Sequence, residues 1–304
     1  MKLFERYYLC AALIFYISAF ADGNSRDTIQ LHYSSGNPVV EVWIDNKGPF
    51  PFIFDTGNTG VVIDLKLAAE LGLQTIGVET VSSPSNPVGF EMPVFGISSL
   101  RIGQTQLSLS EATGLDFSFM QRTENRPKGI IGPWDIQDGL VSIDNCEGIL
   151  IIESSAELSP DSPGVQELVR QKSFPYPQFE ITIAGQSGKA HIDTGSTAGT
   201  TLPLEWSRKL SFSTPLEIAG TARMVGGAKT IWRAKLTGNV QILGVVLENP
   251  ILHFIDGLPS INVGSSILSS GILTIDLTND LIRFTSVKMN VDEGVLNCDV
   301  AERK

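Results

Sequence analysis

Two aspartates in matching surroundings are the residues of this sequence best placed to do chemistry. Asp55 lies in FDTGNTG and Asp193 in HIDTGST, each directly after an apolar run that predicts a strand. The Gly after each Asp-Thr pair permits a tight turn with close backbone approach. Two carboxyl groups a few ångströms apart cannot both ionise readily, so they share one proton. The ionised member can then take a proton from water while the other hydrogen-bonds a carbonyl, which would hydrolyse an amide without a covalent intermediate.

An internal repeat contains the two motifs. PFIFDTGNTGVVIDLKLAAELGL (51–73) and GKAHIDTGSTAGTTLPLEWSRKL (188–210) share a strand, Asp-Thr-Gly, a polar pair, an apolar stretch and a helix. Further along, GIIGPWDIQDGLVSIDNCEGILII (129–152) matches INVGSSILSSGILTIDLTNDLIRF (261–284). A lone Asp-Thr-Gly is a common surface turn. Two copies in equivalent places favour a pseudo-twofold arrangement that brings both turns face to face.

The elements that must position these motifs are mainly strands. Short apolar or alternating segments bounded by Gly, Pro, Asn and Asp predict a mostly β protein. The strands with the clearest signal are 39–44, 50–54, 149–152, 179–183 and 272–275, and helices are expected over 64–71, 203–210 and 164–171. The expected domain organisation is a signal peptide at 1–21, a first half at 28–153, a Ser- and Pro-rich linker at 154–177, a second half at 178–286 and a tail at 287–304.

The first 21 residues have the layout of a cleaved export signal. Two basic residues precede an apolar run from Tyr7 to Phe20, which ends in Ala-Phe-Ala. The run is shorter than the roughly 20 residues that span a bilayer, so an uncleaved anchor is the weaker alternative. We expect an exported protein, periplasmic or secreted, whose mature chain has no membrane span. The net charge of −11 argues against nucleic acid as a partner.

Two cysteines remain after removal of such a signal. Cys146 and Cys298 could form one disulfide that ties the tail to the first half, and two free thiols are the equally open alternative. Two thiols and three scattered histidines match no metal-ligand pattern, so no metal or cofactor is expected.

The motifs FDTGNTG and HIDTGST resemble the active-site loops of aspartic peptidases of the pepsin and retropepsin group. The stretch VEVWIDNKGPFPFIFDTGNTGVVIDLKLAAELGL (40–73) is similar to the start of a bacterial retropepsin-like domain. This resemblance implies two related acid-protease-like β-barrel halves in a pseudo-twofold, single-chain fold. It also implies an aspartic endopeptidase that acts on a peptide or protein substrate. Such an enzyme would be a monomer that works as a pseudo-dimer of its two related halves.

The resemblance assigns roles to individual residues. Asp55 and Asp193 would be the catalytic pair, and the Ser196 hydroxyl would bond the outer oxygen of Asp193. The hydroxyls of Thr56 and Thr194 would lock the facing loops together. The remaining loop and support positions are Gly57, Asn58, Gly195 and the segments 130–132 and 262–264. Asn58 and Asn262 depart from the family pattern, because Ser, Thr or Ala is usual at the first position and an apolar residue at the second.

Several positions keep more than one interpretation. The segment 223–234, with Gly226 and Gly227 at its turn, and the segment 78–94 could be flaps over the site or ordinary hairpins. His191 lies two residues before Asp193, but a single histidine near a strand end is more often packed than catalytic. A catalytically silent relative that binds peptides or a partner is the main alternative function, and pairing of two chains is a further alternative.

Overall fold

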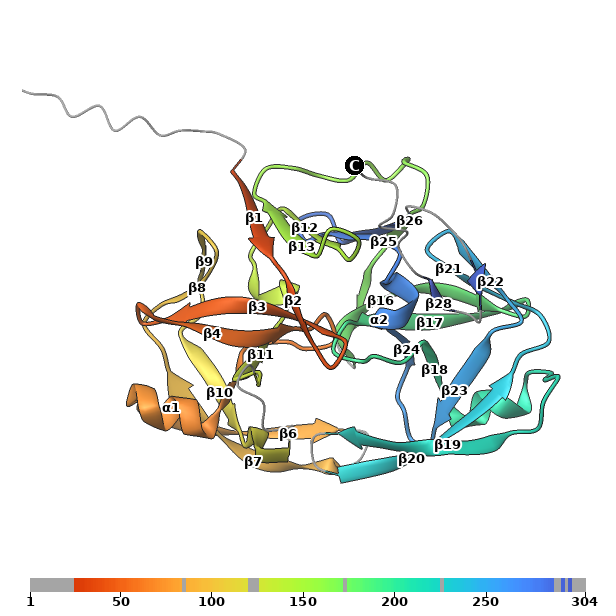
Figure 1. Cartoon of the computed structure of the whole chain (residues 1–304), viewed down its shortest axis with the longest axis horizontal. Coiled ribbons are helices and arrows are strands. Elements are labelled where there is room, and N and C mark those ends of the chain that lie inside the picture. Colours follow the sequence, from red (N-terminus) through yellow and green to blue (C-terminus); the bar gives the residue numbers. More distant parts are fainter. Residues whose placement is uncertain are drawn as a thin grey trace, which may run out of the picture.

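The computed structural model describes residues 25–83, 86–119, 126–171, 174–224, 227–286, 291–292 and 295–296. These residues form two ten-stranded sheets, a six-stranded sheet that joins them and a small pair, β27 (Val291–Asp292) with β28 (Val295–Leu296) (Figure 1). The predicted mostly β fold with two related halves is therefore confirmed.

The first half is built on one ten-stranded sheet. Its strands are ordered β6-β7-β10-β5-β11-β4-β3-β8-β9, with β2 paired to β3. Their bounds are β2 His32–Ser34, β3 Asn37–Ile44, β4 Lys47–Phe54, β5 Val62–Asp64, β6 Thr75–Ser83, β7 Asn86–Gly96, β8 Leu100–Ile102, β9 Thr105–Leu107, β10 Glu111–Leu115 and β11 Gly129–Ile131.

The second half repeats this topology strand for strand. Its order is β19-β20-β23-β18-β24-β17-β16-β21-β22, with β15 paired to β16. The bounds are β15 Val169–Gln171, β16 Phe174–Ile183, β17 Gln186–Asp193, β18 Thr200–Pro203, β19 Glu217–Met224, β20 Gly227–Lys235, β21 Asn239–Ile242, β22 Val245–Glu248, β23 Ile251–Ile255 and β24 Ile261–Gly264. The repeat seen in the sequence is thus a repeat of the whole sheet.

The pseudo-twofold axis that relates the two halves runs through the six-stranded sheet. This sheet is ordered β1-β13-β12-β25-β26-β14, from β1 (Arg26–Gln30), β13 (Ile149–Glu153), β12 (Leu140–Asp144), β25 (Gly271–Asp276), β26 (Leu281–Ser286) and β14 (Val165–Glu167). Ser142 of β12 pairs with Thr274 of β25, and their hydroxyls lie 3.0 Å apart. These two residues are equivalent in the repeat, so the axis passes between them.

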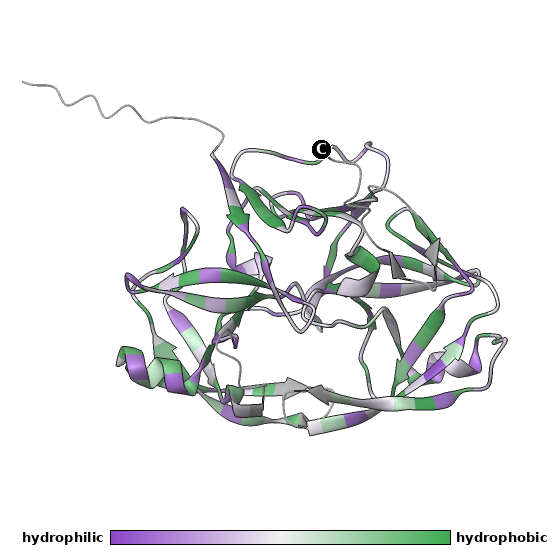
Figure 2. Ribbon diagram, in the orientation of Figure 1, coloured by the Kyte–Doolittle hydropathy of each residue, from purple (hydrophilic) through white to green (hydrophobic). Residues whose placement is uncertain are grey.

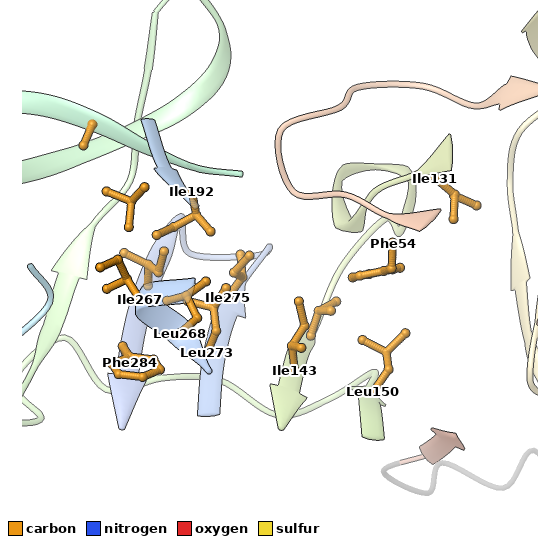
Figure 3. Close-up of a cluster of buried hydrophobic side chains, with 14 of the residues drawn as sticks. Phe54, Ile131, Ile143, Leu150, Ile192, Ile267, Leu268, Leu273, Ile275 and Phe284 are labelled. Atoms are coloured by element: carbon orange, nitrogen blue, oxygen red, sulfur yellow. The ribbon is translucent and has the colours of Figure 1, made fainter. Parts of the chain in front are cut away.

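Buried aliphatic and aromatic side chains support the two motif strands from below. Figure 2 shows hydrophobic segments in the strands of both halves and of the joining sheet. Along strands such as β8 and β21, buried residues alternate with more exposed ones, which gives the sheet one face for the core. Phe54 and Ile192, the residues directly before the two aspartates, are 0% and 4% exposed. Figure 3 shows Phe54 over Ile143 and Leu150 in one group, and Ile192 with Ile275 in an equivalent group. Both aspartates therefore follow strands that are anchored in the core.

Helices are short and lie outside the sheets. The helix expected over 64–71 is α1 (Leu65–Leu71), where the Asp64 side chain accepts a hydrogen bond from Lys66 N–H and Gly72 ends the helix at φ 72°. The others are α2 (Ser265–Leu268) and three 3₁₀ turns, η1 (Phe117–Phe119), η2 (Pro133–Asp135) and η3 (Leu204–Arg208). The segment expected as a helix over 203–210 thus contains only η3.

The helix predicted over 164–171 is wrong. That stretch contains β14, which pairs with β26 at one end of the six-stranded sheet, and β15, which pairs with the start of β16. Backbone hydrogen bonding to a neighbouring strand outweighed a weak helical pattern. The expected linker at 154–177 therefore contains these two strands and the start of β16.

The structure bears in part on the predicted disulfide between Cys146 and Cys298. Cys146 is disulfide-bonded, and Cys298, its predicted partner, lies outside the described residues. The nearby strand β28 packs against α2, and the Asn145 side chain donates to Leu268 O of α2 at 3.0 Å. The chain two residues before Cys298 thus lies close to the turn that holds Cys146.

The predicted signal peptide also lies outside the described residues, and none of the helices described is long and apolar enough to cross a membrane.

Candidate active site

The two Asp-Thr-Gly turns sit at the ends of central strands. Asp55 follows β4 and its N–H donates to Ile131 O of the parallel strand β11 at 2.8 Å, while Asp193 ends β17 beside Gly264 of β24. Gly132 and Gly264 pass directly behind the turns. A β-carbon at Gly132 would lie 2.7 Å from Asp55 O, so only glycine fits. Each turn is therefore held from behind by its own half.

A reciprocal pair of hydrogen bonds joins the two turns. The N–H of Thr56 donates to Thr194 Oγ1, and the N–H of Thr194 donates to Thr56 Oγ1, both at 3.0 Å. The Thr194 hydroxyl also donates to Phe54 O at 2.7 Å. Both threonines are nearly inaccessible, at 0% and 2% exposed. Because donor and acceptor exchange across the axis, neither turn can shift without breaking bonds in the other half.

This lock brings the two carboxyl groups together. A β-carbon added at Gly195 would lie 2.5 Å from Asp55 Cγ, and one added at Gly57 would lie 2.8 Å from Asp193 Cγ. Each glycine therefore faces the carboxyl group of the opposite half, and the absence of a side chain at these positions lets the two aspartates meet.

Backbone N–H groups from both halves bind the Asp55 carboxyl group. Asp55 Oδ1 accepts from Gly57 N–H at 2.7 Å and from Gly195 N–H at 3.1 Å. Burial and the neighbouring charge of Asp193 nevertheless raise the pKa of Asp55 well above its usual range. The pair is therefore suited to sharing one proton at a pH where isolated carboxyl groups would both be charged.

Asp193 receives one donor on each oxygen. Ser196 N–H donates to Asp193 Oδ1 at 2.9 Å, and the Asn262 amide donates from Nδ2 to Asp193 Oδ2. The hydroxyl of Ser196, expected to bond Asp193, instead accepts from Ala198 N–H at 3.4 Å. The Asn58 amide donates to Gly60 O at 2.6 Å and makes its bond within its own turn. The surroundings of the two carboxyl groups therefore differ.

Trp134 and Asp135 hold the first turn in a way that the sequence analysis missed. Trp134 Nε1 donates to Thr56 O at 2.8 Å. Asp135 Oδ1 accepts from Gly60 N–H and its Oδ2 from Gly132 N–H, both at 3.0 Å. The position of Pro-Trp-Asp directly after Gly132, where the second half has Ser-Ser-Ile, was the available signal.

An aromatic cluster, Phe174, Tyr176 and His191, lies beside Asp193. The rings of Tyr176 and His191 stack with centroids 5.2 Å apart, and Phe174 contacts both edgewise. Burial and the charges of Asp55 and Asp193 raise the pKa of Tyr176 to about 12. Burial lowers the pKa of His191, while the charge of Asp193 opposes that shift. His191 is thus packed among aromatic rings, as the simpler interpretation expected. It is also close enough to Asp193 for that charge to affect its pKa.

The two segments suggested as flaps are equivalent hairpins. The β6–β7 hairpin and the β19–β20 hairpin lie at equivalent ends of the two ten-stranded sheets. In Figure 1 both run toward the middle of the molecule on the side opposite the six-stranded sheet. Gly227 begins β20, whereas Gly226 lies outside the described residues. Among the described residues, no group of three or more His, Cys, Asp or Glu is arranged to hold a metal ion.

Asp135 gives a testable link between this site and stability. Burial raises its pKa from 3.8 to about 6, against the opposing effect of two N–H donors. A carboxyl group whose folded pKa is raised contributes stability that is complete below its unfolded pKa and is lost as pH rises through the folded pKa. We expect wild type to lose on the order of 2–3 kcal/mol of unfolding free energy, relative to Asp135→Asn, between about pH 4 and 6.

Urea unfolding of wild type and Asp135→Asn at several pH values measures this difference in unfolding free energy. The pH-dependent contributions of the other carboxyl groups are common to both proteins and cancel in the difference. Asp138→Asn, at an exposed position three residues on, is the matched control and should run parallel to wild type. Parallel curves for Asp135→Asn as well would show that Asp135 titrates normally.

A pseudo-twofold pair of β halves with two facing Asp-Thr-Gly turns defines a single-chain aspartic-type protease. The model of the aspartyl protease family matches residues 40–133 and 179–277, more than half of the chain and one match in each half. The chain belongs to the aspartyl protease family. A comparison with curated proteins gives no match.

Proposed function

We propose that this protein is an exported aspartic endopeptidase that hydrolyses peptide bonds with a water molecule activated between Asp55 and Asp193. The observation that carries the proposal is the facing carboxyl pair, in which Asp55 is bound by N–H donors from both halves. Family membership supports proteolytic activity and peptide substrates in general. The layout of residues 1–21 supports export to the periplasm or beyond the cell.

The proposed mechanism uses the shared proton. The ionised carboxylate takes a proton from water as the water attacks the scissile carbonyl carbon, and the protonated carboxyl group donates a hydrogen bond to the carbonyl oxygen. The threonine lock limits motion of either group, which keeps the reacting distances short. Proton transfer to the leaving nitrogen then completes cleavage and restores the monoanionic pair.

The two hairpins are proposed as flaps that cover a bound peptide. Each contains an edge strand, β6 or β19, and a peptide can add to such an edge through backbone hydrogen bonds. Ile76, Val78, Val88 and Ile218 on these hairpins are exposed, and Val88 is 90% accessible. Because exposed apolar side chains on a flap can pack against a bound peptide, these side chains favour substrates with apolar residues near the cleaved bond.

A pH profile of hydrolysis tests this proposal. We expect a bell-shaped curve with its optimum below neutrality, because activity requires one charged and one protonated carboxyl group. On the alkaline limb activity falls as the second proton leaves the pair. The raised pKa of Asp55 moves this limb to higher pH than an isolated carboxyl group would give. The measurement is cleavage of an unbiased peptide library by the protein without residues 1–21, followed by mass spectrometry across acidic to neutral pH.

Asp55→Asn, treated identically, identifies cleavage by contaminants. A metal chelator or a serine-directed inhibitor should leave the rate unchanged. A rate that climbs steadily into the alkaline range, or that is lost on chelation, would contradict the mechanism. Peptide binding without cleavage at any pH would favour the catalytically silent alternative.

A further inference from the structure

Asn262 breaks the symmetry of the site. It lies on β24, which pairs with β17 on one side and β18 on the other, and it is 9% exposed. Its equivalent in the first half is Ile130 of β11. The strand behind one aspartate thus presents an amide, whereas the strand behind the other presents a hydrocarbon side chain.

The amide changes how donors are divided between the two carboxyl groups. Asp193 receives Ser196 N–H on Oδ1 and Asn262 Nδ2 on Oδ2. Asp55 receives both of its backbone donors on Oδ1. A donor on each oxygen favours the ionised form of Asp193 from both sides, because hydrogen bonds to a charged group are the stronger ones. Oδ2 of Asp55 is left to carry the shared proton.

Asn262 also has an unfavourable feature that a purely structural residue would not need. Its Oδ1 is buried without a hydrogen-bond partner among the described residues. An unpaired buried acceptor destabilises a protein, and an apolar side chain such as the one at position 130 would avoid that cost. Stability therefore does not account for the amide, but its contact with Asp193 does.

The titratable groups around Asp193 come from three directions. Asp55 faces it from the turn after β4, His191 lies on its own strand β17, and Tyr176 stacks on His191 from β16. His191 pairs directly with Asn262 across β17 and β24, and burial favours its neutral form. The Asn262 amide, in contrast to these three groups, does not titrate, so its hydrogen bond to Asp193 persists across the pH range of the reaction.

We propose that Asn262 is a positioning residue that holds Asp193 as the ionised member of the pair, so that Asp193 accepts the proton from water and Asp55 donates to the substrate carbonyl. This inference rests on the proposed peptidase function. It makes the division of roles between the two aspartates a property of β24, which lies behind the catalytic turn.

The test replaces Asn262 with the residue found in the other half. In Asn262→Ile the monoanionic pair forms less readily, so the acid limb of the kcat/KM profile should move to higher pH. We expect about a tenfold loss on the acid side and a smaller loss at the alkaline limb. A residue that only supports the fold would lower activity evenly at all pH values. Thr201→Val, which removes a buried hydroxyl at the paired position on β18, is the matched control and should not move either limb.

A second measurement does not depend on turnover. Carbon-13 NMR of protein labelled at the aspartate carboxyl groups follows the first ionisation of the pair, which should occur at higher pH in Asn262→Ile than in wild type. If Asn262→Ile does not fold, as judged by circular dichroism, Asn262→Ser replaces it in both measurements. The shorter serine side chain removes the amide donor from Asp193 and introduces no bulky apolar group.

The outcomes separate this inference from the peptidase function. An unmoved acid limb together with an unmoved NMR titration overturns the role of Asn262, even if Asp55→Asn abolishes hydrolysis and the function stands. A shifted NMR titration in a protein that cleaves no peptide supports the role of Asn262 while the peptidase function fails.

Discussion

Asparagine in place of Asp55 or Asp193 is expected to lower kcat/KM for peptide hydrolysis by at least about a thousandfold. An amide can neither take the proton from water nor supply one, so each variant lacks one half of the shared-proton mechanism. The two losses should not add in the double variant, because the carboxyl groups act as one unit.

The fold should survive these changes. Asparagine keeps the shape of the side chain and can still accept from Gly57 and Gly195 N–H at position 55. Because the folded pKa of Asp55 is raised, wild type loses stability as pH rises through that value, and Asp55→Asn should lose less. Circular dichroism and urea unfolding check the fold, and Asp138→Asn controls for removal of an exposed carboxylate. Near-normal turnover in either variant would refute the assignment of the pair.

The sequence was most informative where function depends on local backbone. Asp-Thr-Gly needs a glycine wherever it occurs, so the motif is visible without knowledge of its neighbours. Duplication of the motif at equivalent places then predicted the pseudo-twofold arrangement. The strands around 50–54 and 272–275 were predictable because their apolar runs are bounded by turn residues.

What the sequence did not reveal is which side chains from distant segments support the two turns. Asp135 binds the N–H of Gly60, 75 positions away, and Asn262 reaches Asp193 across 69 positions. Sequence periodicity does not show such contacts, because they depend on which strands become neighbours and in what register. Asn262 was visible only as a departure from the family pattern. Its consequence became clear only when β24 was placed beside β17.

The glycines of the two turns lead to the second large expected effect. Each lies against the carboxyl group of the opposite half, and a β-carbon at position 195 would overlap Asp55. A rigid neighbour cannot absorb such an overlap, because real β-carbons essentially never approach other atoms closer than 3.0 Å. The threonine lock prevents the turn from moving away as a whole. The only relief is displacement of the carboxyl group itself.

Gly195→Ala should therefore leave both aspartates present but misplaced, with kcat/KM reduced about a hundredfold or more, since a shift of about 1 Å in a reacting group has an effect of that size. Gly57→Ala should behave alike through Asp193. The matched control is Gly199→Ala in the same loop, whose β-carbon would meet Ser266 Oγ at an ordinary 3.5 Å and should change kcat/KM little. Steady-state kinetics on one peptide compares the three folded variants. Equal activity of Gly195→Ala and Gly199→Ala would mean that the carboxyl pair tolerates displacement, and the close approach of the two turns would lose its functional meaning.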